Sequence, residues 1–308
     1  MVFQMPSDHK TIGVIGLGSI GMRHAKNLIA MGHKVIGYDP DMSRRMELGG
    51  ILYEPHEIFD DQIVDGLVIA SPTKLHLPHL ADAAGIGVPI FVEKPISDRN
   101  PTSVLEAMYV AHEASSPIMV GTNLRFHSCV KKAKEWLEQG LIGKPLWASF
   151  CVAQHNTKYT DPVILNWGAH ECDLALYLLG PATVTAAAGN DQIMDVCLLH
   201  EYGVPSTVHM DYVTEPEIRF HTVTGTRGTI EIDICARYIG IRSGHGKGYF
   251  KDWLDLSDTS FDTDYIEEMQ AFIDLIDGKP VPHAATGADG LACLELILEA
   301  QRIANASV

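Results

Sequence analysis

Residues 11–22 read Thr-Ile-Gly-Val-Ile-Gly-Leu-Gly-Ser-Ile-Gly-Met, an apolar, β-branched run that leads directly into the glycine pattern Gly16-x-Gly18-x-x-Gly21. This pattern predicts a strand, a tight turn and the start of a helix. In such a unit Gly16 permits the turn, Gly18 lets the backbone approach a pyrophosphate, and Gly21 lets the helix pack close to the strand. The N–H groups of the first helical residues, Ser19 and Ile20, then face the phosphates at the positive end of the helix dipole.

The surroundings of the glycines distinguish a dinucleotide site from a plain strand-to-helix turn, which the glycines alone would also fit. A second apolar run, residues 33–38, ends at Asp39, about 20 residues beyond the glycines, as a dinucleotide fold requires. The Asp39 carboxylate would accept hydrogen bonds from ribose hydroxyls and repel a 2′-phosphate, which favours NAD over NADP. Asp39 also suits the start of a turn, and Arg44 and Arg45 could pair with a phosphate, so NADP remains the less favoured alternative.

Composition excludes several classes of partner. The 308 residues carry a net charge of −16, which argues against nucleic acid and anionic membrane surfaces. The first ten residues lack the apolar core of a signal peptide, and no apolar run approaches the roughly 20 residues that span a bilayer. The six cysteines are scattered without a CxxC pair and are interpreted as reduced thiols, so we expect a cytoplasmic protein.

The 15 histidines raise the question of a metal site. His76 and His79 are three residues apart, and His170 begins the sequence His-Glu-Cys-Asp, which superficially resembles a zinc-binding helix. It is not HExxH, because residue 174 is Leu. We therefore expect no metal.

The order of the predicted elements divides the chain into two domains. Over residues 1–121, apolar strands near 11–15, 34–38, 66–70, 90–92 and 118–120 alternate with helices, which is typical of a doubly wound α/β (Rossmann) domain with a parallel sheet. Residues 122–308 combine helices, one of them near 169–179, with alternating β-branched runs. This pattern predicts an α+β domain with a large, mostly antiparallel open sheet. Whether the last helices, near 264–277 and 288–304, pack back on the first domain stays open.

Two strand ends of the first domain carry polar residues, and ligands of a doubly wound sheet bind beyond such ends. Ser71, Pro72, Thr73 and His76 follow one strand, and residues 93–95, Glu-Lys-Pro, follow the next. We expect these residues to bind the cofactor, Glu93 and Lys94 included. A lysine beside a bound nicotinamide could exchange a proton with a substrate, since desolvation lowers its pKa toward the working range. The alternative is a surface lysine paired with Glu93.

Five segments together decide how these residues are interpreted. They are GVIGLGSIGMRH, SPTKLH, FVEKP, NLRFH and NWGAHECDLALYLLG, followed near the end by YIEEMQAFIDLIDGK. Together they resemble the glucose–fructose oxidoreductase and inositol dehydrogenase (Gfo/Idh/MocA) family over nearly the whole chain. The resemblance implies an NAD(P)-dependent dehydrogenase or reductase acting on a CH–OH group of a sugar, cyclitol or nucleotide-sugar.

The resemblance also implies roles for individual residues. Lys94 matches the lysine of the family's EKP motif, a cofactor-site residue that contacts the substrate hydroxyl and transfers a proton, and Pro95 would set the turn. His170 matches the histidine that faces that hydroxyl, with Asp173 in support. Asn123 and Arg125 match a segment that lines the substrate cleft.

One position departs from the family pattern. Asn166 stands four residues before His170, where many of these dehydrogenases carry Asp. An amide can bind a substrate but cannot take up a proton, so Lys94 and His170 would share the proton work. The departure keeps a non-catalytic NAD-binding regulator open as the alternative function, and a methyltransferase is a more distant one. The resemblance further implies a homodimer or homotetramer formed through the C-terminal sheet.

Overall fold

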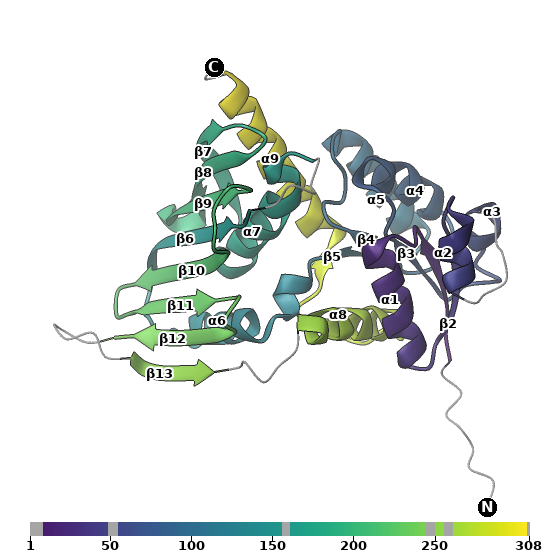
Figure 1. The fold of residues 1–308 in the computed structure, drawn as a ribbon, viewed down its shortest axis with the longest axis horizontal. Helices are drawn as coiled ribbons and strands as arrows, with labels where there is room; N and C mark the ends of the chain where they lie inside the picture. Colours follow the sequence, from purple (N-terminus) through teal and green to yellow (C-terminus); the bar gives the residue numbers. More distant parts are fainter. Residues whose placement is uncertain (1–8, 49–54, 156–160, 244–249, 256–260, 307–308) are drawn as a thin grey trace, which may run out of the picture. The chain divides into compact units, whose positions relative to one another are not determined.

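The computed structural model describes residues 9–48, 55–155, 161–243, 250–255 and 261–306 (Figure 1). The chain divides into two compact units. The first comprises Met1–Gly121 and Tyr265–Leu291, and the second comprises Thr122–Asp264 and Ala292–Val308. The last two helices therefore belong partly to the first unit, because α8 (Phe261–Ile276) lies mostly in it and α9 (Gly287–Ala306) begins in it.

The first unit is built on a six-stranded sheet of order β14-β5-β4-β3-β1-β2. All neighbours are parallel except β14, which runs antiparallel to β5. The strands are β1 (Thr11–Ile15), β2 (Lys34–Tyr38), β3 (Gly66–Ile69), β4 (Ile90–Glu93), β5 (Ile118–Gly121) and β14 (Ala285–Thr286). The strand order reverses between β1 and β3, and ligands of doubly wound sheets bind at such a point, beyond the carboxyl ends of the strands.

Helices bury this sheet. They are α1 (Ser19–Ala30), α2 (Met42–Glu47), α3 (Pro55–Ile58), α4 (His76–Ala83), α5 (Pro101–Glu113) and α8, with a 3-10 turn η1 (Thr73–Leu75). Every residue of β3 and β4 is buried, which explains why the sequence shows continuous apolar runs there. Helix α8 packs on the sheet through Phe272, whose ring centroid lies 5.8 Å from that of Phe91 in β4. No helix among the described residues is long and apolar enough to cross a membrane.

The second unit carries an eight-stranded sheet of order β13-β12-β11-β10-β6-β9-β8-β7. All pairs are antiparallel except β6 with β9. The strands are β6 (Pro145–Ala153), β7 (Ala182–Gly189), β8 (Ile193–His200), β9 (Pro205–Asp211), β10 (Ile218–Gly225), β11 (Thr229–Asp233), β12 (Tyr238–Arg242) and β13 (Phe250–Asp255). The predicted fold class, a Rossmann domain followed by a domain with a mostly antiparallel sheet, is confirmed.

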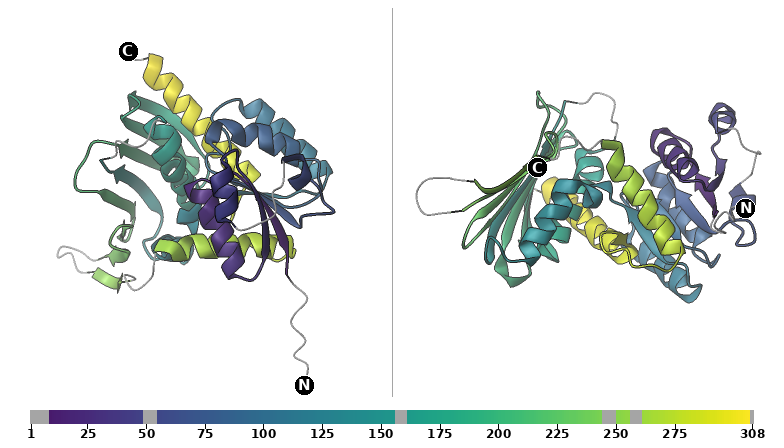
Figure 2. Two further views of the ribbon diagram at one scale, coloured as in Figure 1. Left: turned by 45° about the vertical axis from the view of Figure 1, so that its right-hand side comes forward. Right: turned by 90° about the horizontal axis from the view of Figure 1, so that it is seen from below.

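In the part of the chain that the structure describes, one face of this sheet packs against helices and the other does not. Strand β8 alternates strictly between exposed and buried residues, as a half-covered strand must. Helices α6 (Ser128–Glu138) and α7 (Val163–Leu179) lie on the covered face (Figure 2) and share a core with the later part of α9. Helix α7 begins at Val163, six residues before the predicted start, because Pro162 precedes it with an extended backbone that allows a helix to begin.

Candidate functional site

The glycine loop between β1 and α1 is shaped by two glycines that the protein itself requires. Gly16 has φ +90°, and a Cβ there would lie 2.7 Å from the Ala70 carbonyl oxygen. A Cβ on Gly21 would lie 1.9 Å from the carbonyl oxygen of Gly16. Both substitutions would drive a methyl group into backbone, so these glycines are explained by turn geometry and by close packing of α1.

Gly18 is different, because no contact among the described residues explains it. Its φ is −65°, which any residue adopts, and a Cβ there would meet no atom closer than Arg44 Nη1 at 3.9 Å. Helix α1 starts at the next residue, Ser19, so its first N–H groups open onto the same space. A glycine at a helix N-terminus that no protein contact requires is explained by a pyrophosphate that must approach the backbone at this point.

Asp39 ends β2 beside the glycine loop and is almost fully buried. Its Oδ2 accepts a hydrogen bond from the Leu17 N–H at 2.8 Å, and its Oδ1 accepts one from the Asp41 N–H at 2.9 Å. The carboxylate therefore shapes the loop and the following turn, whatever it binds. Arg44 Nη1 lies 3.3 Å from Asp39 Oδ2, whereas Arg45 is engaged with the Asp39 carbonyl oxygen and the Tyr38 ring. Of the two arginines, Arg44 is the one beside the Asp39 carboxylate, which the sequence predicts to bind ribose.

The strand ends of β3 and β4 are joined by His76. Its Nε2 lies 2.7 Å from the carbonyl oxygen of Ser71, and its Nδ1 lies 2.7 Å from that of Pro95. Burial lowers the pKa of His76, while the two carbonyl groups act in the opposite direction. His76 thus braces the predicted cofactor segment Ser71, Pro72 and Thr73 against the turn that follows β4.

Lys94 begins that turn, one residue after β4, and is half-buried. Its peptide bond to Pro95 is cis. Its backbone N–H donates to Glu93 Oε2 at 3.2 Å, and the other oxygen, Glu93 Oε1, lies 2.7 Å from His24 Nε2. The His24 hydrogen bond and the charges of His24 and Lys94 hold the pKa of Glu93 below its usual value despite its burial. The alternative of a surface lysine paired with Glu93 stays open, because Lys94 is half-buried and its charge helps to lower the pKa of Glu93.

In the second unit, His170 and Asn166 lie one helical turn apart on α7 and so share a face of that helix. His170 is 8% exposed, and its ring centroid lies 6.3 Å from that of Trp167. Asn123 lies in a 3-10 turn, η2 (Asn123–Phe126), and is half-buried.

Arg125, from the same turn as Asn123, makes a buried bidentate ion pair with Asp173 of α7. Arg125 Nε lies 2.9 Å from Asp173 Oδ2, and Nη2 lies 2.7 Å from Oδ1. Through this ion pair, Asp173 holds the Arg125 side chain in place. A substrate contact by Arg125 stays a prediction.

A second buried network on α7 was not predicted from the sequence. Glu171 Oε1 accepts from Arg219 Nε at 2.8 Å, and Glu171 Oε2 lies 3.4 Å from His221 Nε2. Arg219 and His221 come from β10, almost 50 residues further along the chain. His24 was missed in the same way. A histidine in a helix and an arginine in a strand give no local signal that each has a buried carboxylate as its partner.

Comparison with known proteins identifies the family. Residues 10–122 match the model "Oxidoreductase family, NAD-binding Rossmann fold", and residues 130–231 match the model "GFO/IDH/MocA C-terminal domain". The chain belongs to the Gfo/Idh/MocA family of oxidoreductases. The predicted family, enzyme class and cofactor NAD are thereby confirmed.

Named members of the family match most of the chain. The scyllo-inositol 2-dehydrogenase (NAD(+)) of Bacillus subtilis is 27% identical, with 92% of this chain and 90% of that protein covered. The inositol 2-dehydrogenase of Rhizobium meliloti is 27% identical, with 76% of each chain covered. Among solved structures, a UDP-N-acetylglucosamine 3-dehydrogenase from Acidithiobacillus ferrooxidans superposes with a TM-score of 0.84 at 20% identity, covering 97% of this chain and 98% of that one. At that identity the superposition supports the fold alone.

Proposed function

We propose that the protein transfers a hydride between NAD and a secondary alcohol carbon of a sugar, cyclitol or nucleotide-sugar, with Lys94 as the group that takes the hydroxyl proton. The position of Lys94 is the main support. It follows β4, and the glycine loop follows β1, in one parallel sheet. Carboxyl ends of parallel strands share one edge of a sheet, so the proton acceptor and the pyrophosphate loop occupy the same edge.

Residues of the first unit would hold the cofactor. The N–H groups of Ser19 and Ile20 at the start of α1 bind the pyrophosphate, and Asp39 accepts hydrogen bonds from the ribose. Residues 71–73 and His76 line the loop beyond β3. When bound, NAD supplies the hydride acceptor. We assign the dinucleotide-binding role to residues 1–121 and the substrate-binding role to residues 122–308.

The protein residues manage the proton. Lys94 in its neutral form accepts the hydroxyl proton as the hydride leaves, and the ammonium form returns the proton in the reverse reaction. In the second unit, His170 donates or accepts a hydrogen bond at a substrate hydroxyl, and Asn166, on the same face of α7, orients another hydroxyl through its amide. The relatives that act on inositols support a substrate with several adjacent hydroxyl groups.

The experiment is a substrate panel with a Lys94→Met variant. NADH formation is followed for scyllo-inositol, myo-inositol, levoglucosan and UDP-N-acetylglucosamine, and NADH binding is measured separately by fluorescence. We expect Lys94→Met to lower kcat by about 10²–10⁴-fold, the usual contribution of a general base, while the protein still binds NADH. A matched His170→Gln variant tests whether the histidine shares the proton work.

Two outcomes contradict the proposal in different ways. NADH binding by a wild-type protein that turns over none of these compounds favours the non-catalytic regulator. Full activity of Lys94→Met removes the lysine as base and leaves His170 in its place.

We further propose that the protein is a cytoplasmic homodimer or homotetramer assembled through the uncovered face of the eight-stranded sheet. Large apolar side chains on β6 and β8 support this surface, because Trp147 and Leu199 are 41 and 43% exposed. Light scattering coupled to size exclusion tests it. A Trp147→Glu variant should shift the mass to that of a monomer, while the charge-matched control Tyr109→Glu, in α5 of the first unit, should not.

A further inference from the structure

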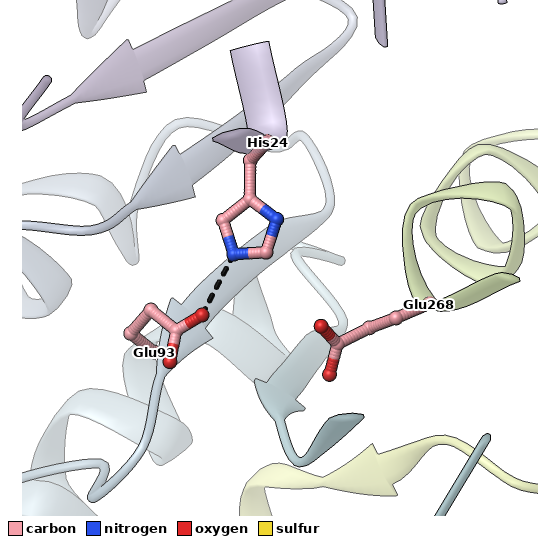
Figure 3. Close-up of side chains that lie close together, drawn as sticks. All are labelled: His24, Glu93 and Glu268. Carbon is pink, nitrogen blue, oxygen red and sulfur yellow. Dashed lines mark hydrogen bonds and ion pairs between the residues drawn. The ribbon is translucent and has the colours of Figure 1, made fainter. Parts of the chain in front are cut away.

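Three buried side chains from distant parts of the chain meet in the first unit (Figure 3). They are His24 of α1, Glu93 of β4 and Glu268 of α8, with exposed fractions of 0, 7 and 0%. One nitrogen or oxygen atom from each lies within 4.8 Å of the others. Burying ionisable groups this close together costs desolvation free energy, so such a cluster is expected to serve a purpose other than stability.

One histidine and two carboxylates are suitable ligands for a divalent cation, but the geometry favours a hydrogen bond. His24 Nε2 and Glu93 Oε1 are 2.7 Å apart, whereas two ligands of a tetrahedral zinc ion would be roughly 3.4 Å apart at its usual bond lengths. A metal-bound imidazole almost always donates its other N–H to a carbonyl or carboxylate. Within the described residues, His24 Nδ1 has no hydrogen-bond partner. A proton on Nε2, donated to Glu93, is therefore what joins the two residues.

The contacts of Glu93 connect the two functional segments of the unit. His24 lies on α1, the helix that starts at the glycine loop, and donates to Glu93 Oε1. Glu93 Oε2 accepts the backbone N–H of Lys94 at 3.2 Å. A continuous path thus runs from the pyrophosphate loop through α1, His24 and Glu93 to the backbone of the proton-transferring lysine.

The surroundings hold these groups in one arrangement. The His24 ring packs against Phe91 at 5.1 Å and Tyr265 at 6.1 Å between ring centroids. Gly121 of β5 leaves room for the carboxylate, because a Cβ there would lie 3.1 Å from Glu93 Cδ. The Glu93 side chain is therefore closely packed. Because packed side chains transmit small movements, a small displacement of α1 would also displace the Glu93 carboxylate.

We propose that His24 and Glu93 are positioning residues, whose hydrogen bond couples the seating of the dinucleotide loop to the placement of Lys94. This inference rests on the proposed function, in which Lys94 transfers the substrate proton. Neither side chain touches the reacting atoms. Misplacing a reacting group by about 1 Å can cost 10²-fold in rate, so a loss of this hydrogen bond is expected to appear in kcat.

Three variants separate positioning from mere stability. His24→Leu removes the donor, and His24→Gln restores an N–H that reaches Glu93. Phe272→Leu is the control, because its ring packs on Phe91 in the same core and lies outside the path. We expect His24→Leu to lower kcat by about tenfold or more, His24→Gln to recover most of it, and Phe272→Leu to lower the melting temperature without changing kcat.

A measurement independent of turnover keeps the inference separate from the proposed function. Hydrogen exchange of the Lys94 amide, which donates to Glu93, is followed by mass spectrometry with and without NADH. In the wild type and in His24→Gln, NADH should slow this exchange at least several-fold, and in His24→Leu the effect should disappear. This result stands even when no substrate of the panel is turned over.

Two results would overturn the inference. The first is a His24→Leu protein that loses stability as Phe272→Leu does but keeps the wild-type kcat and the NADH effect on Lys94 exchange. The second is native mass spectrometry showing one equivalent of Zn²⁺ or Mn²⁺ bound by the wild type and lost in Glu268→Gln, which would make the cluster a cation site.

Discussion

Gly18→Ala should weaken cofactor binding while leaving the fold intact. The added methyl group meets no protein atom closer than 3.9 Å, and the φ of −65° suits alanine. Alanine is a poorer N-cap than glycine, but it also restricts the unfolded chain, so the net change in unfolding free energy is expected to stay within about 1 kcal/mol. The methyl group does occupy the space over which a pyrophosphate oxygen must come to about 2.9 Å from a backbone N–H. Losing one or two such charge-assisted hydrogen bonds, at about 1.5–3 kcal/mol each, should raise the Kd for NADH roughly 10²-fold.

The assay compares NADH fluorescence titration with urea unfolding for three alanine variants. Gly85→Ala is the matched control, since its Cβ would also lie 3.9 Å from the nearest atom but at an exposed position away from the loop. It should keep both affinity and stability. Gly21→Ala should lose stability, because its Cβ would lie 1.9 Å from the Gly16 carbonyl oxygen. A Gly18→Ala protein that binds NADH as the wild type does would refute the argument that a ligand, rather than the chain, requires this glycine.

Three further outcomes follow from the site. Asp39→Asn removes the charge that repels a 2′-phosphate and leaves Arg44, so the ratio of Kd values for NADH and NADPH should move toward NADPH by about tenfold or more in fluorescence titrations. Burial and nearby arginines lower the pKa of His127 to about 3. Because the histidine of the unfolded chain binds a proton below about pH 6.5, the free energy of unfolding should fall by roughly 2 kcal/mol from neutral pH to pH 5. Urea titrations of His127→Asn should not show this fall. Asp173→Asn leaves Arg125 buried without its carboxylate and should cost about 3 kcal/mol of unfolding free energy in the same assay.

What the sequence predicted correctly lies in local segments. Strands β1 and β2 occur at the predicted residues. Apolar runs of this length, flanked by glycine and acidic residues, favour a buried strand on local grounds alone. The hairpin of β7 and β8 was expected only as part of a β-rich region, because half of its residues face solvent and the alternation is weak in β7. The motifs located Lys94 and His170, but their partners could not be predicted. Glu93 is joined to His24 and Glu171 to Arg219 only by folding, across 69 and 48 residues of chain.

Helix α7 shows what buried ion pairs contribute when their net effect on stability is small. Successive residues of a helix are rotated by about 100°, so Glu171 and Asp173 point to nearly opposite sides of α7. Each is fixed by an arginine from a different element, Glu171 by Arg219 of β10 and Asp173 by Arg125 of η2. Apolar side chains in these places would tolerate a rotation of the helix about its axis, whereas two opposed bidentate or charged contacts do not. His170 and Asn166 lie in the sector between the two carboxylates, so the pairs determine the direction in which the proposed substrate-binding groups point.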